Sequence, residues 1–128
     1  MTEPDSRQQQ GQGIHGAFGR HDTHNFMAAV GADFRKGFVD PTPVSNADWA
    51  PTLAKVMGID LPARGALTGR VMREALAADG AAVPTEAFTV RSEPGPGGFT
   101  TILNGQTAAG HSYFDAAGSV GRTVGLKP

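Results

Sequence analysis

The chain has 128 residues, a net charge of −1 and no cysteine. This length suffices for one small domain with a core. No block of Lys or Arg indicates a nucleic-acid-binding face or an anionic-membrane surface, and the lack of cysteine excludes disulfides and thiolate metal sites. The 18 glycines and 9 prolines predict short elements joined by shaped loops.

The first twelve residues form a polar, Gln-rich lead, which we expect to be a flexible tail before a domain of residues 13–128. The lead lacks the apolar core of a signal peptide, and no later stretch is long and apolar enough to cross a membrane. Taken literally, these features predict a cytoplasmic protein. If the chain is a piece of a longer protein, the missing signal leaves its localisation open.

Three of the four histidines fall within ten residues, from His15 to His24. His15 lies in a Gly-Ile-His-Gly turn that allows close approach to a metal ion or phosphate, and neutral imidazole is a common zinc ligand. An ordinary surface histidine explains the same spacing. For His21 and His24 we keep three interpretations: they line a site, one of them orients a metal ligand, or they are simply exposed. Asp22 is better explained as a cap of the turn before Asn25. A small local site built from the three histidines is a further alternative.

Asn25 to Val30 is a short apolar run closed by Gly31, and its length favours a buried strand over a helical turn. Residues 34–44 alternate bulky and polar side chains and contain two prolines, so they predict a loop or an edge segment. The predicted strand has no parallel neighbour in the chain, which would leave its backbone groups unsatisfied. We therefore expect an incomplete domain, completed by upstream sequence or by another chain.

The clearest helix signal begins at Ser45, where Ser-Asn-Ala-Asp resembles a capping box. Four apolar side chains then fall on one face at helical spacing: Trp49, Leu53, Val56 and Met57. Gly58 predicts the C-cap of this helix. A second, shorter helix is predicted over residues 69–78, and its expected core-facing side chains are Val71, Ala75 and Leu76.

The composition favours β-strands from Glu86 onward. We expect strands over 88–91, 99–103 and 112–115, and we expect the last two to pair antiparallel across residues 104–110. The tail after them either lies against the strands or frays. The order of elements predicts an α/β or α+β fold with a small antiparallel region at its C-terminal end.

Several other side chains allow a functional and an ordinary interpretation. Arg20, Arg35 and Lys36 lie near the histidines, where a guanidinium could clamp a phosphate or sulfate, although solvated surface charges explain them equally simply. His111 and Tyr113 share one strand face and either cover a pocket or lie on a half-buried sheet. No Ser/His/Asp set, phosphate-binding loop or dinucleotide fingerprint is visible.

Three short motifs resemble, in order, the late part of the alkaline phosphatase superfamily. They are a His-Gly turn (His15-Gly16), a Gly-x-Asp-Phe segment (Gly31-Ala32-Asp33-Phe34) and a helix start of the form Asp-x-x-Pro-Thr (Asp48-Trp49-Ala50-Pro51-Thr52). Ala32 departs from the proline that is usual in the second motif. The closest branch is the type I phosphodiesterase/nucleotide pyrophosphatase group, with sulfatases as relatives, and residues 113–126 resemble the C-terminal end of some bacterial members.

The resemblance implies the C-terminal part of an alkaline-phosphatase-like α/β sandwich and a metal-dependent hydrolase of phosphate or sulfate esters. Members resembling this chain use a two-metal centre, commonly zinc, and an activated Ser or Thr that attacks phosphorus. Only His15 maps onto a metal ligand. The nucleophile and the other ligands belong to upstream motifs, so the resemblance implies no catalytic residue in this chain and predicts that the chain alone is inactive.

Two other functions remain open from the sequence. The chain is either a non-enzymatic remnant or interaction module, which would self-associate through an exposed strand edge, or a segment of a sulfatase-like sulfuric-ester hydrolase. The localisation of the parent protein also stays open, because members of the family are often exported. The sequence does not identify the ester that is cleaved.

Overall fold

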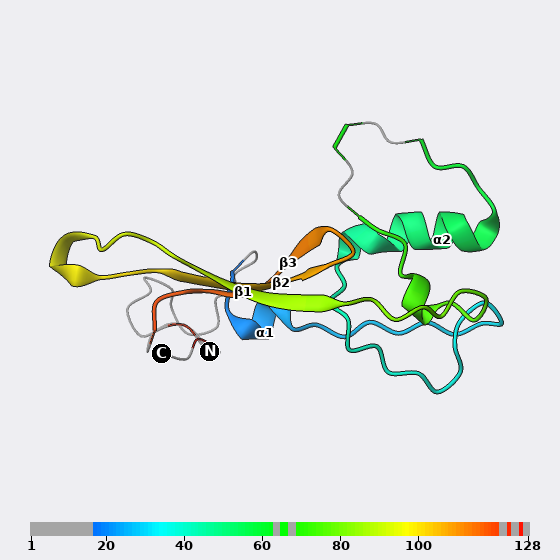
Figure 1. Cartoon of the computed structure of the whole chain (residues 1–128), viewed down its shortest axis with the longest axis horizontal. Coiled ribbons are helices and arrows are strands. Elements are labelled where there is room, and N and C mark those ends of the chain that lie inside the picture. Colours follow the sequence, from blue (N-terminus) through cyan, green and yellow to red (C-terminus); the bar gives the residue numbers. More distant parts are fainter. Residues whose placement is uncertain (1–16, 63–64, 67–68, 121–122, 124–125, 127–128) are drawn as a thin grey trace, which may run out of the picture. The chain divides into compact units, whose positions relative to one another are not determined.

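The computed structural model describes residues 17–62, 65–66, 69–120, 123 and 126. The chain divides into two compact units, which are described in turn. Unit 1 contains the N-terminal residues through Phe26, Ala87–Gln106 and the chain from Phe114 onward, and unit 2 contains Met27–Glu86 and Thr107–Tyr113. Figure 1 shows the helices and strands along the chain. Short helices and one small sheet make up the described structure, which confirms the mixed α and β composition that the sequence predicts.

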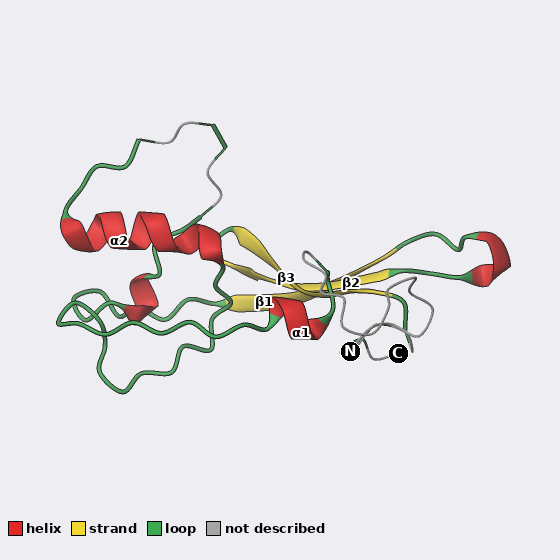
Figure 2. Cartoon of the chain, turned by 180° about the vertical axis from the view of Figure 1, so that it is seen from behind, coloured by secondary structure: helices red, strands yellow, loops and turns green. Residues whose placement is uncertain are grey.

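Three strands form one antiparallel sheet in the order β1-β2-β3, drawn in yellow in Figure 2. They are Thr85–Arg91 (β1), Ile102–Ala108 (β2) and His111–Gly118 (β3). The predicted antiparallel pairing of the last two strands is confirmed. The turn is tighter than expected, because β2 continues to Ala108 and the chain reverses at Ala109 and Gly110, both at positive φ.

Strand β1 lies at one edge of this sheet, and nearly all of its residues are exposed. An edge strand presents unpaired backbone groups to a possible partner. β1 is therefore one strand edge that is available for the predicted self-association, which stays a prediction.

The core of unit 1 is small and consists of Ile102, Ala116 and Leu126. Leu126 belongs to the tail, so part of the tail lies against the strands. Residues 20–23 form the one-turn helix α1 (Arg20–Thr23). The Thr23 hydroxyl donates to the Asp115 carbonyl, which holds the helix against β3.

The main helix of unit 2, α2 (Trp49–Met57), confirms the predicted helix. A 3-10 turn (Asn46–Asp48) precedes it, the predicted capping box at Ser45 is present, and Gly58 ends it at a φ of 64°. Thr52 is the buried residue of this helix, whereas Leu53 and Met57 are 41% and 67% exposed. The apolar face of α2 is therefore largely uncovered. In the described part of the chain, no helix has the length and apolarity to cross a membrane.

The predicted helix over residues 69–78 is wrong, and only the 3-10 turn Arg73–Ala75 forms there. The backbone before that turn is held in contacts with the start of α2. The Arg70 N–H donates to Asp48 Oδ1 (2.9 Å), and the Met72 N–H donates to Thr52 Oγ1 (3.0 Å). These tertiary hydrogen bonds replace the bonds that a helix would make, so helix propensity is overridden.

The backbone after that turn pairs with the loop of residues 31–44. An isolated antiparallel bridge joins Phe34 to Leu76, with the Arg35 N–H donating to the Ala75 carbonyl and the Ala77 N–H to the Asp33 carbonyl, both at 2.9 Å. Leu76 is buried as expected. Met72 is buried in place of Val71, because an extended chain alternates its side chains differently from a helix.

The predicted buried strand over Asn25–Val30 is also wrong. The segment has no regular secondary structure, and Phe26 and Val30 are 90% and 98% exposed. The physical reason is that none of the described strands pairs with it, and a buried strand requires hydrogen-bonding neighbours. The chain passes from unit 1 to unit 2 within this segment.

Candidate functional site

His15, the predicted metal ligand, lies outside the described residues. The other predicted site residues, Arg20, His21, Asp22 and His24, belong to α1 and its C-cap in unit 1, and all four are exposed. The turn is closed by the Asn25 side-chain amide, which donates to the backbone carbonyl of Asp22 at 2.9 Å. The predicted turn role of Asp22 therefore uses its backbone carbonyl.

No group of three or more His, Asp or Glu side chains that could hold a metal ion is found in the described ranges. The guanidinium of Arg20 lies 3.9 Å from the Asp115 carboxylate, and both side chains are partly exposed. A pair of this kind stabilises by about 1 kcal/mol at most. The metal role of His15, the alternative of a local histidine cluster and the site-lining roles of the α1 residues all stay predictions.

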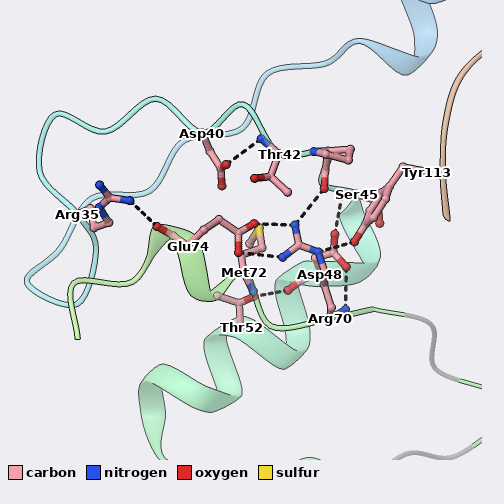
Figure 3. Close-up of polar contacts among 11 residues, drawn as sticks. Arg35, Asp40, Thr42, Ser45, Asp48, Thr52, Arg70, Met72, Glu74 and Tyr113 are labelled. Atoms are coloured by element: carbon pink, nitrogen blue, oxygen red, sulfur yellow. Dashed lines mark hydrogen bonds and ion pairs between the residues drawn. The ribbon is translucent and has the colours of Figure 1, made fainter. Parts of the chain in front are cut away.

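Among the described residues, an extensive polar cluster lies in unit 2 around Arg70 (Figure 3). Arg70 and Glu74 are 5% and 2% exposed and form a bidentate ion pair, with Nη1–Oε2 and Nη2–Oε1 distances of 2.9 and 2.6 Å. Arg70 Nε donates to the Tyr113 hydroxyl (2.8 Å), and Nη2 also donates to the Pro43 carbonyl (3.1 Å). The guanidinium of Arg70 thus connects its own extended segment to the loop at Pro43 and to the β2–β3 hairpin at Tyr113. We call these side chains, with Asp48 and Thr52, the Arg70 network.

Asp48 and Thr52 connect this network to helix α2, and each is 1% exposed. Asp48 accepts the Ser45 N–H at Oδ2 (2.8 Å) and the Arg70 N–H at Oδ1 (2.9 Å). The Thr52 hydroxyl donates to the Asp48 carbonyl (2.7 Å) and accepts from the Met72 N–H. Among the described residues, every buried side-chain nitrogen and oxygen has a hydrogen-bond partner. The network is therefore fully satisfied, which is the condition for a polar cluster to stabilise a core.

Gly69 allows the chain to enter this network. A Cβ at this position would lie 2.0 Å from the Ala47 carbonyl oxygen, so no larger residue fits without a backbone shift. This close approach brings the backbone of residue 70 within reach of the Asp48 carboxylate.

The charges in the network shift two pKa values. Burial by itself lowers the pKa of Arg70, but the hydrogen bonds and charge of Glu74 outweigh it, so this pKa is raised above its usual value. Burial raises the pKa of Tyr113; the Arg70 charge opposes this change and the Asp48 carboxylate adds to it. Both shifts favour the protonated forms, in which the guanidinium of Arg70 donates to the neutral hydroxyl of Tyr113.

The sequence spacing of Arg70 and Glu74 indicates a different arrangement from the one that the structure has. Arg70 and Glu74 have the i, i+4 spacing of a solvent-exposed pair on the predicted helix. Because the helix does not form, the same spacing spans an extended segment and a turn, and the pair is buried. Tyr113 was expected to cover a pocket or to lie on a half-buried sheet, and it is buried against Arg70.

A groove of about 360 Å³ lies along helix α2 and the turn that follows it. Its lining is mostly apolar and includes Ala50, Ala54, Ile59 and Leu61. Lys55 is the charged side chain among the lining residues. The volume is in the range of clefts that hold small ligands or single large side chains.

Comparisons with protein-family models, with curated proteins and with solved structures found no match to this chain. The function is therefore inferred from the motifs in the sequence and from the geometry of the two units.

Proposed function

We propose that this chain is the C-terminal part of a metal-dependent phosphoric-ester hydrolase of the alkaline phosphatase superfamily. In this proposal, His15 supplies one ligand to a divalent metal centre, with zinc as the favoured metal, and the substrate is a phosphodiester. The nucleophile and the remaining ligands lie on polypeptide outside this chain. The α/β sandwich is part of the same proposal, and its support begins with the three motifs in their expected order.

The exposed apolar segment of residues 25–30 carries the proposal. Phe26 and Val30, at 90% and 98% exposed, are the two most exposed large apolar side chains among the described residues. Hydrogen bonds fix the chain on both sides, from Thr23 to Asp115 and from Ala77 to Asp33. A restrained, apolar segment that pairs with none of the described strands is the surface that a missing part of the domain would cover.

The arrangement of the second and third motifs gives further support. Asp33 pairs with the backbone of Ala77, and Asp48 and Thr52 bind the backbone at residues 70 and 72. One extended segment of unit 2 therefore holds both motifs in fixed positions. Such fixed positioning is what a catalytic centre requires of the scaffold around it.

A bound metal would stabilise the attacking and leaving oxygens of the phosphoryl transfer. In this chain, the imidazole of His15 would hold the metal. The sequence offers no candidate nucleophile, so the isolated chain should not turn over a nitrophenyl phosphodiester in the presence of zinc. Substantial zinc-dependent turnover by the purified chain would overturn the division of the site between this chain and other polypeptide.

The decisive experiment begins with the genomic sequence directly upstream. An adjacent coding stretch should contain a Ser or Thr nucleophile with Asp and His ligands. Co-production of that segment with this chain should give zinc-dependent hydrolysis that His15→Ala abolishes and the matched control His21→Ala retains. Equal losses in both variants would contradict the specific role of His15, and an upstream region without such residues would contradict the proposal.

An interaction module without enzymatic activity is the second candidate, and the same exposed segment favours it. Under this candidate, a partner protein covers Phe26 and Val30 but contributes no nucleophile or metal ligand. Pull-down from the native host, followed by identification of the bound protein, separates the two functions. A partner with the expected Ser or Thr and acidic ligands favours the hydrolase, and a partner without them favours the module.

A further inference from the structure

The connection between β1 and β2 forms a protruding arm in unit 1, which we define as residues 92–101 (Figure 1). The Ser92 N–H donates to the Thr101 carbonyl (2.9 Å) and the Gly95 N–H to the Phe99 carbonyl (2.8 Å), so two backbone hydrogen bonds join the two sides of the arm beyond the paired strands. Residues 92–99 are all exposed. The arm is therefore an ordered projection without cover from the described residues.

Phe99 stands at the tip of this arm and is 66% exposed. A 3-10 turn (Pro96–Gly98) precedes it, and a Cβ on Gly97 would lie 3.3 Å from a carbon of its ring. The ring is thus held against the turn. A fixed aromatic side chain in water is the kind of anchor that fills a pocket on a partner, because little conformational freedom is lost on binding.

The groove along α2 in unit 2 has the complementary character. It is lined largely by small and aliphatic side chains, and Lys55 is the charged residue in its lining. Glu93 is the only charged residue of the arm. An aromatic anchor with one carboxylate therefore matches an apolar groove with one ammonium group, and every copy of the chain carries both surfaces.

We propose that the arm tip docks into the α2 groove of a second copy of this chain, with Phe99 in the groove and Glu93 against Lys55. The contact is heterologous, because two different surfaces of the chain meet. It is independent of the proposed hydrolase function. It also differs from pairing through the β1 edge, because its specificity comes from side chains of the arm and not from the strand backbone.

The test is the concentration dependence of the molar mass of the full chain, measured by size-exclusion chromatography with light scattering. Phe99→Ser and Ala50→Arg, which blocks the groove, should each raise the dissociation constant roughly tenfold or more. Val90→Ser removes another exposed apolar side chain near the base of the arm and is the matched control, which should leave the constant unchanged. Trp49 fluorescence and circular dichroism check that each variant is folded.

Two combinations of variants test whether the arm of one copy binds the groove of another. A mixture of Phe99→Ser chains, which keep the groove, with Ala50→Arg chains, which keep the arm, should form one-to-one complexes although each variant alone is monomeric. The single variants Lys55→Glu and Glu93→Lys should each weaken association, and both changes in one chain should restore it. A wild-type chain that is monomeric at all concentrations, or association that persists in Phe99→Ser and Ala50→Arg, would overturn the proposal.

Discussion

The Arg70 network and the segment of residues 25–30 reverse the usual distribution of polar and apolar side chains. The network buries an Arg-Glu pair, an aspartate and a threonine, whereas the segment keeps Phe26 and Val30 in water. Buried charges are tolerated when every partner is present, and exposed apolar side chains are tolerated when another surface covers them. The first region is therefore complete within this chain, and the second is the surface that a partner would cover under the proposed function.

The largest effect is expected for Glu74→Gln, which leaves the Arg70 charge buried without its carboxylate. Loss of one member of a buried ion pair costs about 3–5 kcal/mol of unfolding free energy. Urea unfolding followed by the fluorescence of Trp49, the single tryptophan, measures this change beside the network. The matched control is Asp79→Asn in the partly exposed Arg73–Asp79 pair, which should cost less than about 1 kcal/mol. Equal effects of the two changes would remove the contrast between buried and exposed charges.

Thr52→Val should have the next largest effect, although it introduces an apolar residue into a buried position. The substitution keeps the shape of the side chain but leaves the Met72 N–H without its acceptor at 3.0 Å. An unsatisfied buried donor costs about 1–3 kcal/mol. Faster hydrogen exchange at the Met72 amide would identify the cause, and a stabilised Thr52→Val protein would show that Thr52 is replaceable by apolar packing.

Tyr113→Phe should cost about 1–2 kcal/mol at neutral pH, because the hydroxyl accepts a hydrogen bond from charged Arg70. The folded-state pKa of Tyr113 lies above its usual value of 10.0, so the folded state binds this proton more tightly. Its contribution is present below pH 10.0 and is lost as the pH rises through the folded-state pKa. Tyr113 is the only tyrosine, so ultraviolet absorbance of the phenolate follows its titration directly. Titration at or below the usual pKa would contradict its burial in the network.

The smallest effect on stability is expected for Phe26→Ser and Val30→Ser. Both side chains are almost fully exposed, so either change should alter the unfolding free energy by about 0.5 kcal/mol or less. Their effect should instead be weaker capture of the partner in the pull-down. A destabilisation comparable to that of Thr52→Val would mean that the segment is buried in the isolated chain in solution.

Local signals in the sequence predicted the parts of the fold that depend on neighbouring residues. The capping box at Ser45, the C-cap at Gly58 and the hairpin between β2 and β3 follow from short-range geometry, and all three are confirmed. Residues 69–78 have a helical pattern, but backbone bonds to Asp48 and Thr52 override it. The strand predicted at 25–30 fails for the opposite reason, because no described strand provides the partner that its apolar composition requires.

Less of the candidate site than of the fold could be predicted from the sequence. The proposed ligand role of His15 rests on its motif, and the described geometry of the other predicted residues brings them together only on the exposed helix α1. The Arg70 network depends on contacts between residues as distant as Arg70 and Tyr113. No local pattern encodes such a contact, so the network could be found only from the structure.

The exposed stretch from Phe26 to Val30 also connects the lifetime of this protein to its assembly. Chaperones and proteases remove proteins that display unfolded features, and an exposed apolar segment presents such a feature in an otherwise folded chain. Under the proposed function, the partner that completes the domain hides this degradation signal. Unassembled copies would then be cleared, and the cellular amount of this chain would follow the supply of its partner.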